Sequence, residues 1–296
     1  ASKSFYRRSS LGQWNTPPHH YCLYVTALVD KDIAEEPDDE ETIPSITLKS
    51  GISKEPYSIF VRLPESYETN IRKKYPVVYH VDGNAFFDPI SSSMDRLSKQ
   101  KKIPVDAIVV GIGYENAYVM DSLRNRDYTF PKALPKDSFH ISGGGERFYH
   151  FIKTELKPYI ERTYRTDTTS RTLLGHSLGG YFVLYALLKE IEGNGLFNNY
   201  VAASPSIWYH DRYILKQFQN LRSENKNHRE LKLYLTTGEM EIAENPANSF
   251  YYFEQIPGNQ DFIQVKRKIY KDLEHMGTAV PSFEDGLAFV LSTTRF

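Results

Sequence analysis

The segment with the clearest potential for chemistry is TLLGHSLGGYFVLYALL, from Thr172 to Leu188. It contains the pattern G-x-S-x-G, in which small residues allow a sharp strand-to-helix turn that lifts the serine oxygen clear of the backbone. An apolar run precedes the pattern, as in a buried strand, and apolar residues at helical spacing follow it. A glycine-rich turn that only packs a helix on a sheet would explain Gly179 and Gly180 but not a serine at the apex. We therefore predict that Ser177 is a nucleophile.

A serine is a weak nucleophile at neutral pH, so it needs a base within hydrogen-bond reach. In hydrolases with this kind of turn the chain order is nucleophile, acid and histidine, and the histidine follows the last strand. The histidines after Ser177 are His210, His228 and His275, and only His275 falls between the last expected strand and the last expected helix. We predict that His275 is the base. The alternative is a histidine that caps or packs a loop.

The carboxylate that orients such a base is expected after a late strand. The strand-like run LKLYLTTG leads directly into EMEIAE, which offers Glu239, Glu241 and Glu244. We predict Glu241, because a residue three positions past the glycine has cleared the turn. Glu239 is expected to point along the strand and Glu244 to lie in a following helix, and the choice among the three stays open from the sequence.

The reaction also needs N–H donors aimed at the developing oxyanion. Folds of this kind take one donor from the residue after the nucleophile and one from the loop after an early strand. Leu178 supplies the first. The second is expected from VDGNAFF, where the chain leaves a buried strand through Asp82 and Gly83, and the N–H of Asn84 is the natural candidate. Asp82 itself is expected to fix this turn rather than to do chemistry.

The elements that must position these residues alternate between strands and helices. Short apolar runs closed by glycine, at 76–83 and 105–113, are typical of strands buried on both faces of a parallel sheet. The alternation predicts a doubly wound α/β sheet. Further strands are expected at 45–50, 57–64, 200–206, 232–238 and 262–270, and 171–174 is expected to be the end of another. Helices are expected at 145–164, 213–221, 248–256 and 281–294, the last with Pro281 at its start.

Length and composition limit the class of protein. A chain of 296 residues, 40% hydrophobic and 25% charged, is predicted to fold as a single domain over residues 1–296. The formal charge of -1 argues against nucleic acid and anionic membranes as partners. Cys22 is the only cysteine, and no apolar run is long enough to span a bilayer, so we expect a cytoplasmic protein. The acidic stretch from Asp30 to Thr42 is expected to be a solvated loop.

Several segments, taken together and in order, resemble the esterase D-type α/β hydrolases, and within them the siderophore esterase branch that hydrolyses ferric enterobactin-like ester siderophores. They include YPVVYHVDGNAFF, RNRDYTFP, TLLGHSLGGYFVLYAL, ASPSIWYHD, TTGEMEIAE and LEHMGTAVPSFEDGLAF. The resemblance implies the α/β-hydrolase fold, with a mostly parallel central sheet flanked by helices. It also implies Ser177 as nucleophile, His275 as base, and the amides of Asn84 and Leu178 as oxyanion hole. Some siderophore esterases resemble a Ser–His dyad, which leaves the part played by Glu241 open.

Within SLRNRDYTFP the resemblance implies an arginine that faces the substrate, and both Arg124 and Arg126 are available. We favour Arg126. A guanidinium fork there can bind the oxygen acceptors of an iron complex or polarise an ester carbonyl. The alternative is an arginine that holds the loop by pairing with Asp121 or Asp127. Trp208 is expected near the mouth of the pocket, either packing there or contacting an aromatic substrate.

The stretch from Gly113 to Gly145 is too long for a simple connection, and we predict that it forms part of the substrate pocket, as lid insertions do. Its arginines and lysines predict a basic pocket wall. His19, His20 and His140 lack ligand-spaced carboxylates or cysteines, so neither a metal site nor a cofactor is expected.

The predicted function is a serine esterase that hydrolyses the ester bonds of an iron-siderophore scaffold through an acyl-enzyme and so releases iron. Its partner is a small-molecule ester, and catecholate and hydroxamate siderophores both remain open. The first alternative keeps the chemistry and changes the substrate: a general carboxylesterase, an acetyl or feruloyl esterase for carbohydrates, or an S-formylglutathione-type thioesterase. The second is a non-catalytic binding module with the hydrolase shape, which would not need Ser177 and His275 together.

Overall fold

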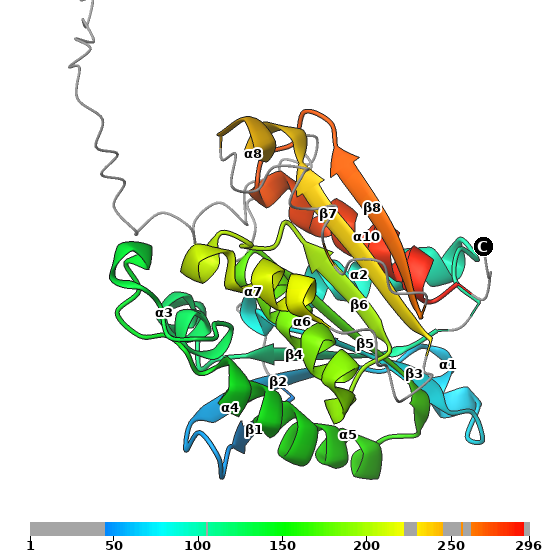
Figure 1. The fold of residues 1–296 in the computed structure, drawn as a ribbon. Coiled ribbons are helices and arrows are strands. Elements are labelled where there is room, and N and C mark those ends of the chain that lie inside the picture. The colour runs from blue at the N-terminus through cyan, green and yellow to red at the C-terminus, as the bar shows by residue number, and fades with distance from the viewer. Residues whose placement is uncertain (1–44, 105, 222–229, 245–255, 257–261, 293–296) are drawn as a thin grey trace, which may run out of the picture.

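The described part of the chain is built around one sheet. The computed structural model describes residues 45–104, 106–221, 230–244, 256 and 262–292. Within these residues, eight strands pair in the order β1-β2-β4-β3-β5-β6-β7-β8 (Figure 1). Every neighbouring pair from β4 to β8 is parallel, whereas β1–β2 and β2–β4 are antiparallel. The predicted mostly parallel α/β sheet is confirmed.

The strands follow the apolar runs of the sequence. The central strands β3 and β4 are buried along their whole length, as expected where helices cover both faces of a parallel sheet. The edge strand β1 instead alternates between half-buried and exposed residues. The strands are β1 (Ile46–Lys49), β2 (Pro56–Arg62), β3 (Tyr75–His80), β4 (Ile108–Gly113), β5 (Thr166–His176), β6 (Asn199–Ala203), β7 (Leu231–Gly238) and β8 (Ile263–Tyr270).

Helices cover both faces of the sheet. Helices α2 and α10 pack on one face and against each other, while α6 packs on the opposite face beside α4 and α5 (Figure 1). None of the helices in the described ranges is both long and apolar enough to cross a bilayer. The helices are α1 (Ser66–Thr69), α2 (Gly83–Lys99), α3 (Ala117–Asp127), α4 (Gly145–Phe151), α5 (Lys157–Thr163), α6 (Leu178–Lys189), α7 (Tyr209–Asn220), α8 (Glu239–Glu244) and α10 (Ala279–Val290), with short turns η2 (Pro135–Asp137), η3 (Ile152–Leu156), η4 (Glu190–Asn194) and η6 (Met276–Thr278).

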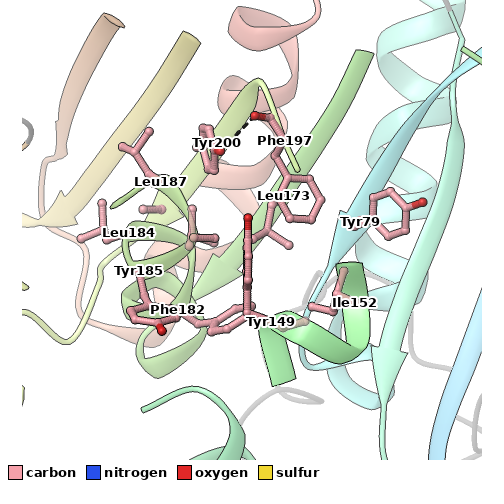
Figure 2. Packing of buried hydrophobic residues seen from close by; sticks show 14 of the residues in the cluster. Tyr79, Tyr149, Ile152, Leu173, Phe182, Leu184, Tyr185, Leu187, Phe197 and Tyr200 are labelled. Atoms are coloured by element: carbon pink, nitrogen blue, oxygen red, sulfur yellow. Dashed lines mark hydrogen bonds between the residues drawn. The ribbon is translucent and has the colours of Figure 1, made fainter. Parts of the chain in front are cut away.

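The larger apolar core lies between the sheet and the layer formed by α4, η3 and α6. Figure 2 shows Tyr79 of β3 and Leu173 of β5 in this layer with Ile152 of η3 and Phe182 of α6, and all four are fully buried. Burying one such side chain stabilises the fold by about 1.5–3 kcal/mol. A second core lies on the opposite face, under α2 and α10. Packing from both faces therefore fixes β3 and β5, whose ends carry the candidate site.

Some elements differ in detail from their expected bounds. The helix expected at 145–164 is interrupted by a π-helical turn at η3, which separates α4 from α5. Helix α7 includes Tyr209, but His210, Asp211 and Arg212 have left-handed dihedrals, so its regular part begins near Tyr213 as expected. The last helix begins two residues before Pro281, which therefore lies in the first turn, where its missing N–H removes no helical hydrogen bond. The acidic stretch 30–42 and most of the helix expected at 248–256 lie outside the described residues.

Candidate active site

The candidate site lies where the strand order of the sheet reverses. Strand β3 pairs in parallel with both β4 and β5, so the connections on its two sides run in opposite directions across the sheet. In open α/β sheets such a reversal opens a crevice at the carboxyl ends of the strands, and ligands bind there. The turn at Asp82 leaves β3 here, and Ser177 follows β5. The N–H of Val81 donates to the carbonyl of Leu174 at 3.2 Å and holds the two strand ends together.

Ser177 occupies a sharp turn between β5 and α6. Its φ of 60° and ψ of -120° are unfavourable for a residue with a side chain. Two backbone hydrogen bonds hold it there: Ser177 N–H donates to the carbonyl of Ala203, and Ser206 N–H donates to the carbonyl of Ser177, each at 3.0 Å. A Cβ atom at Gly175 would lie only 2.4 Å from the carbonyl oxygen of Gly179. The turn therefore needs a glycine at this position, as the G-x-S-x-G pattern predicts.

His275 and Glu241 form a short contact. His275 Nδ1 lies 2.6 Å from Glu241 Oε2. The Glu241 side chain is 4% exposed and that of His275 is 33% exposed. Burial acts to raise the pKa of Glu241, but hydrogen bonds and the charge of His275 outweigh it and hold the pKa below its ordinary value of 4.5. The carboxylate is therefore ionised at neutral pH and fixes the ring of His275 through Nδ1.

Two further hydrogen bonds hold the other oxygen of Glu241. Ser204 Oγ donates to Oε1 at 2.6 Å, and the backbone N–H of Gly238 donates to the same oxygen at 2.7 Å. Ser204 Oγ also lies 2.7 Å from the hydroxyl of Thr278, which donates to the carbonyl of His275 at 2.7 Å. This network fixes both partners of the His275–Glu241 contact.

The other two candidate glutamates differ from Glu241. Glu239 Oε2 accepts the N–H of Asp272 at 3.1 Å, so it holds a turn near the end of β8. Glu244 is the last residue of α8, and its side chain lies outside the described part of the chain. The geometry therefore favours Glu241 as the orienting carboxylate, and its catalytic role stays a prediction.

His176, the residue before the predicted nucleophile, holds the backbone of His275. Its Nε2 lies 2.8 Å from the carbonyl oxygen of His275, and the two ring centroids are 4.6 Å apart. Burial holds the pKa of His176 well below its ordinary value, and the neighbouring His275 lowers it further. His176 is therefore neutral, and its Nε2–H donates to the carbonyl. The sequence interpretation missed this residue, although it stands inside the G-x-S-x-G pattern.

The hydroxyl of Ser177 lies beside a second serine. Ser206 is 3% exposed, and its Oγ is 3.4 Å from the Oγ of Ser177. Ser204 and Ser206 were also missed as site residues. The available signal was their place in ASPS, directly after a buried strand that ends at the same edge of the sheet as Ser177. The roles of Ser177 as nucleophile and His275 as its base stay predictions.

Both amides expected to form the oxyanion hole lie in the first turn of a helix. Leu178 is the first residue of α6 and Asn84 is the second of α2. First-turn N–H groups have no partner within their helix, and the helix N-terminus favours negative charge. The side chain of Asn84 accepts the N–H of Tyr114 at 2.8 Å and donates to its carbonyl at 3.0 Å, which ties this turn to the end of β4.

The two arginines expected near the substrate are both paired with carboxylates. Arg124 donates through Nε and Nη2 to the two oxygens of Asp82, each at 2.9 Å. Arg126 binds Asp127 in the same two-point manner, at 2.8 and 2.9 Å, and lies 3.2 Å from Glu55. This geometry fits the loop-holding alternative for Arg126. Contact of either arginine with substrate stays a prediction. Pairing balances the charge of these two arginines, which were expected to contribute to a basic pocket wall.

Trp208 lies between the insertion and helix α7. Its ring centroid is 6.2 Å from that of Phe139 in the insertion and 6.3 Å from that of Tyr209. The hydroxyl of Tyr209 donates to the carbonyl of Pro131 at 2.8 Å. Trp208 thus packs against the stretch Gly113–Gly145, which contains α3 and η2, and its contact with substrate stays a prediction.

Within the described ranges, no group of three His, Cys, Asp or Glu side chains is placed to hold a metal ion. His140 is exposed, and His19 and His20 lie outside these ranges.

A serine at a strand-to-helix turn after β5, with a paired carboxylate and histidine after β7 and β8, defines the chain as a protein of the α/β-hydrolase fold. The family named Esterase, described as "Putative esterase", matches residues 50–276, and the chain belongs to this family.

Proteins that act on siderophores are among its relatives. The chain is 36% identical over 195 residues to the ferri-bacillibactin esterase BesA of Bacillus subtilis, covering 62% of this chain and 66% of that protein. It is 32% identical over 184 residues to a siderophore enterobactin esterase of Emericella nidulans, covering 57% of this chain and 59% of that protein. The crystal structure of the BES protein from Bacillus cereus superposes with a TM-score of 0.70 at 29% identity, covering 88% of this chain and 100% of that one. The matched segments span between about half and two thirds of the curated relatives.

Proposed function

We propose that this chain is a serine esterase that hydrolyses the ester bonds of an iron-siderophore scaffold. The observation that carries the proposal is the 2.6 Å contact between His275 Nδ1 and Glu241 Oε2, formed by residues that follow the last two strands of the sheet. A histidine held through Nδ1 by an ionised carboxylate presents Nε2 as a base, which is the requirement for activating a serine hydroxyl.

The reaction proceeds in two halves. In the first, His275 Nε2 takes the proton of Ser177 Oγ as the oxygen attacks the ester carbonyl carbon. The amides of Leu178 and Asn84 stabilise the negative charge that forms on the carbonyl oxygen. The bond to the alcohol oxygen then breaks, and the alcohol leaves with the proton held by His275. In the second half, a water molecule attacks the acyl-enzyme with His275 again as base, and the free acid leaves while Ser177 regains its proton.

The choice of substrate rests on the relatives. Both curated relatives described above are named as esterases of siderophores, one for ferri-bacillibactin and one for enterobactin. A third, 32% identical over 168 residues, is named a triacetylfusarinine C esterase. We infer that this chain opens a siderophore by ester hydrolysis and so weakens its hold on iron. A cytoplasmic site of action, on an imported siderophore, belongs to the same proposal and is tested by cell fractionation.

A substrate panel with a nucleophile control tests the proposal. Ferri-bacillibactin, ferric enterobactin, iron-loaded triacetylfusarinine C, a feruloyl sugar ester and S-formylglutathione are each incubated with the wild type and with Ser177→Ala, and products are followed by mass spectrometry. The proposal expects rapid opening of at least one siderophore by the wild type only. Turnover of the feruloyl ester or the thioester alone would reject the siderophore assignment and keep the esterase mechanism.

A further inference from the structure

We propose that the Arg124–Asp82 ion pair is a positioning unit that sets the two halves of the oxyanion hole relative to each other, rather than a site for substrate. The inference rests on the esterase reaction proposed above. The sequence offers Arg124, beside the favoured Arg126, as a substrate contact, and the inference assigns it a different role. It also gives the insertion a part in the reaction.

The pair fixes the turn that carries one of the two oxyanion donors. Asp82 has a φ of 55° and a ψ of 47°, a left-handed conformation that costs free energy for a residue with a side chain. Its side chain is 1% exposed and receives the two-point contact from Arg124. Its backbone N–H donates to the hydroxyl of Tyr128 at 3.0 Å. Contacts to both the side chain and the backbone of Asp82 therefore hold this turn, and Asn84 follows two residues later.

The same pair also touches the turn that carries the other donor. A Cβ atom at Gly179 would lie 3.1 Å from Asp82 Oδ2, so the carboxylate packs against the first turn of α6, directly beside Leu178. Arg124 Nη2 lies 3.4 Å from the carbonyl oxygen of His176, the residue before Ser177. One guanidinium thus spans from the turn after β3 to the end of β5, and one carboxylate lies between the two helix N-termini.

Charge explains why the two residues must act together. A buried carboxylate beside the two amides opposes the negative charge that develops on the carbonyl oxygen during the reaction. Arg124 cancels that charge and meets the hydrogen-bonding needs of the carboxylate. Removing the arginine alone leaves a buried, uncompensated anion at the site, which is more damaging than removing both charges.

The insertion supplies the contacts that hold Asp82. Arg124 belongs to α3, and Tyr128 follows directly after that helix. The hydroxyls of Tyr57 and Tyr114 donate to Asp127 at 3.1 and 3.2 Å, so the end of α3 is itself tied to β2 and to the residue that follows β4. The stretch Gly113–Gly145 therefore supports the geometry of the oxyanion hole.

A double-mutant cycle with p-nitrophenyl acetate tests the inference. This small ester limits any contact between substrate and Arg124, so losses report on the reaction itself. We expect kcat to fall about 100-fold for Arg124→Met and about 10-fold for Asp82→Asn. The double variant should lie within about threefold of Asp82→Asn, because the uncompensated charge is gone, and KM should stay within about threefold throughout.

Several outcomes would overturn the inference. Losses that multiply in the double variant, or a rise in KM with unchanged kcat for Arg124→Met, would make Arg124 a substrate contact. If Arg124→Met fails to fold, the variant Asp82→Asn tests the inference instead. An unchanged kcat in Asp82→Asn contradicts the positioning role. The control pair is Arg171→Met and Glu161→Gln. In this ion pair Nε and Nη2 of Arg171 both donate to Glu161 Oε1, and Arg171 lies six residues before Ser177 on β5. These variants should lower the melting temperature and leave kcat within about twofold.

The test also separates the two proposals. A wild type that neither hydrolyses the ester nor reacts with a fluorophosphonate at Ser177 contradicts the proposed function, and the inference falls with it. If the wild type is active and its activity depends on Ser177, but the two single losses multiply in the double variant, only the inference is rejected.

Discussion

Two pairs of a basic side chain with a carboxylate, His275–Glu241 and Arg124–Asp82, share their location and their burial. Each lies at the carboxyl edge of the sheet, and each carboxylate is almost fully buried, with 4% and 1% of the side chain exposed. They differ in the basic partner. Imidazole can accept and return a proton during a reaction, whereas a guanidinium stays charged. His275–Glu241 is therefore suited to move a proton, and Arg124–Asp82 is suited to hold a turn.

Replacing the base should give the largest effect. His275→Gln removes the proton acceptor and keeps a polar side chain, so we expect kcat to fall about 10⁴-fold or more on any ester that the wild type hydrolyses. His210→Gln is the control, because that histidine binds the carbonyl of Lys132, and it should stay within about threefold. Steady-state rates at pH 7 with KM measured separately check the prediction. A loss below tenfold for His275→Gln would contradict the assignment.

The next largest effect is expected at the carboxylate. Glu241→Gln keeps the shape and removes the charge that holds Nδ1–H, so kcat should fall about 10³-fold. Glu239→Gln should have less than a threefold effect, because that carboxylate binds the N–H of Asp272 instead. A loss of less than tenfold for Glu241→Gln would show that Ser177 and His275 act as a dyad, the alternative that the sequence left open.

Ser204 should give a smaller loss. It donates to Glu241 Oε1 and has a φ of 40°, which glycine adopts more readily than alanine. Loss of the hydroxyl removes one charge-assisted hydrogen bond, so we expect kcat to fall about tenfold in both Ser204→Ala and Ser204→Gly. If backbone strain were the only role of this residue, Ser204→Gly would match the wild type. Comparing the two variants at equal folded fraction distinguishes the roles.

The smallest expected effect concerns stability rather than rate. Burial lowers the pKa of His80 from 6.5 to about 4. The unfolded chain takes up a proton at this residue below pH 6.5 while the folded chain resists it until about pH 4, so the free energy of unfolding falls as the pH falls through this window. Between pH 7 and 5 the loss from His80 is about 2 kcal/mol.

The variant His80→Asn should remove this part of the pH dependence, because asparagine does not titrate and can still donate to the carbonyl of Val81. Urea unfolding at pH 7 and pH 5 measures the difference. His150→Asn is the matched control, since that side chain is exposed on α4, and it should retain the pH dependence of the wild type. An unchanged pH dependence in His80→Asn would contradict the prediction.

The two pairs also show what the sequence could predict. Glu241 follows β7 and His275 follows β8, and these strands are neighbours in the sheet. The positions of the two residues along the chain therefore predicted that their side chains would meet. The partner of Arg124 was not predictable in this way. Asp82 is 42 residues away along the chain, and the alternative drawn from the sequence named only Asp121 and Asp127 as carboxylate partners. For Arg126, the near neighbour Asp127 is indeed the partner.

Supporting hydroxyl and imidazole groups were harder still to predict. Ser204, Thr278 and His176 act on His275 and Glu241 through hydrogen bonds that depend on side-chain direction at the ends of three different elements. Strand and helix periodicity specifies which face a residue occupies, but it does not specify which of several small polar residues meet at a turn. The sheet and its helices were therefore predictable from apolar runs, and the supporting contacts required the structure.

The central claim is that Ser177, served by His275 and Glu241, forms a covalent intermediate with an ester. The most direct measurement is rapid quenching of the wild type and of Ser177→Ala with a ferric siderophore triester, followed by intact mass and peptide mass analysis. The account predicts a transient acyl adduct on the peptide that contains Ser177, absent from the alanine variant, whose turnover falls to background. Turnover that persists in Ser177→Ala, or a wild type that shows neither an adduct nor turnover, would contradict it.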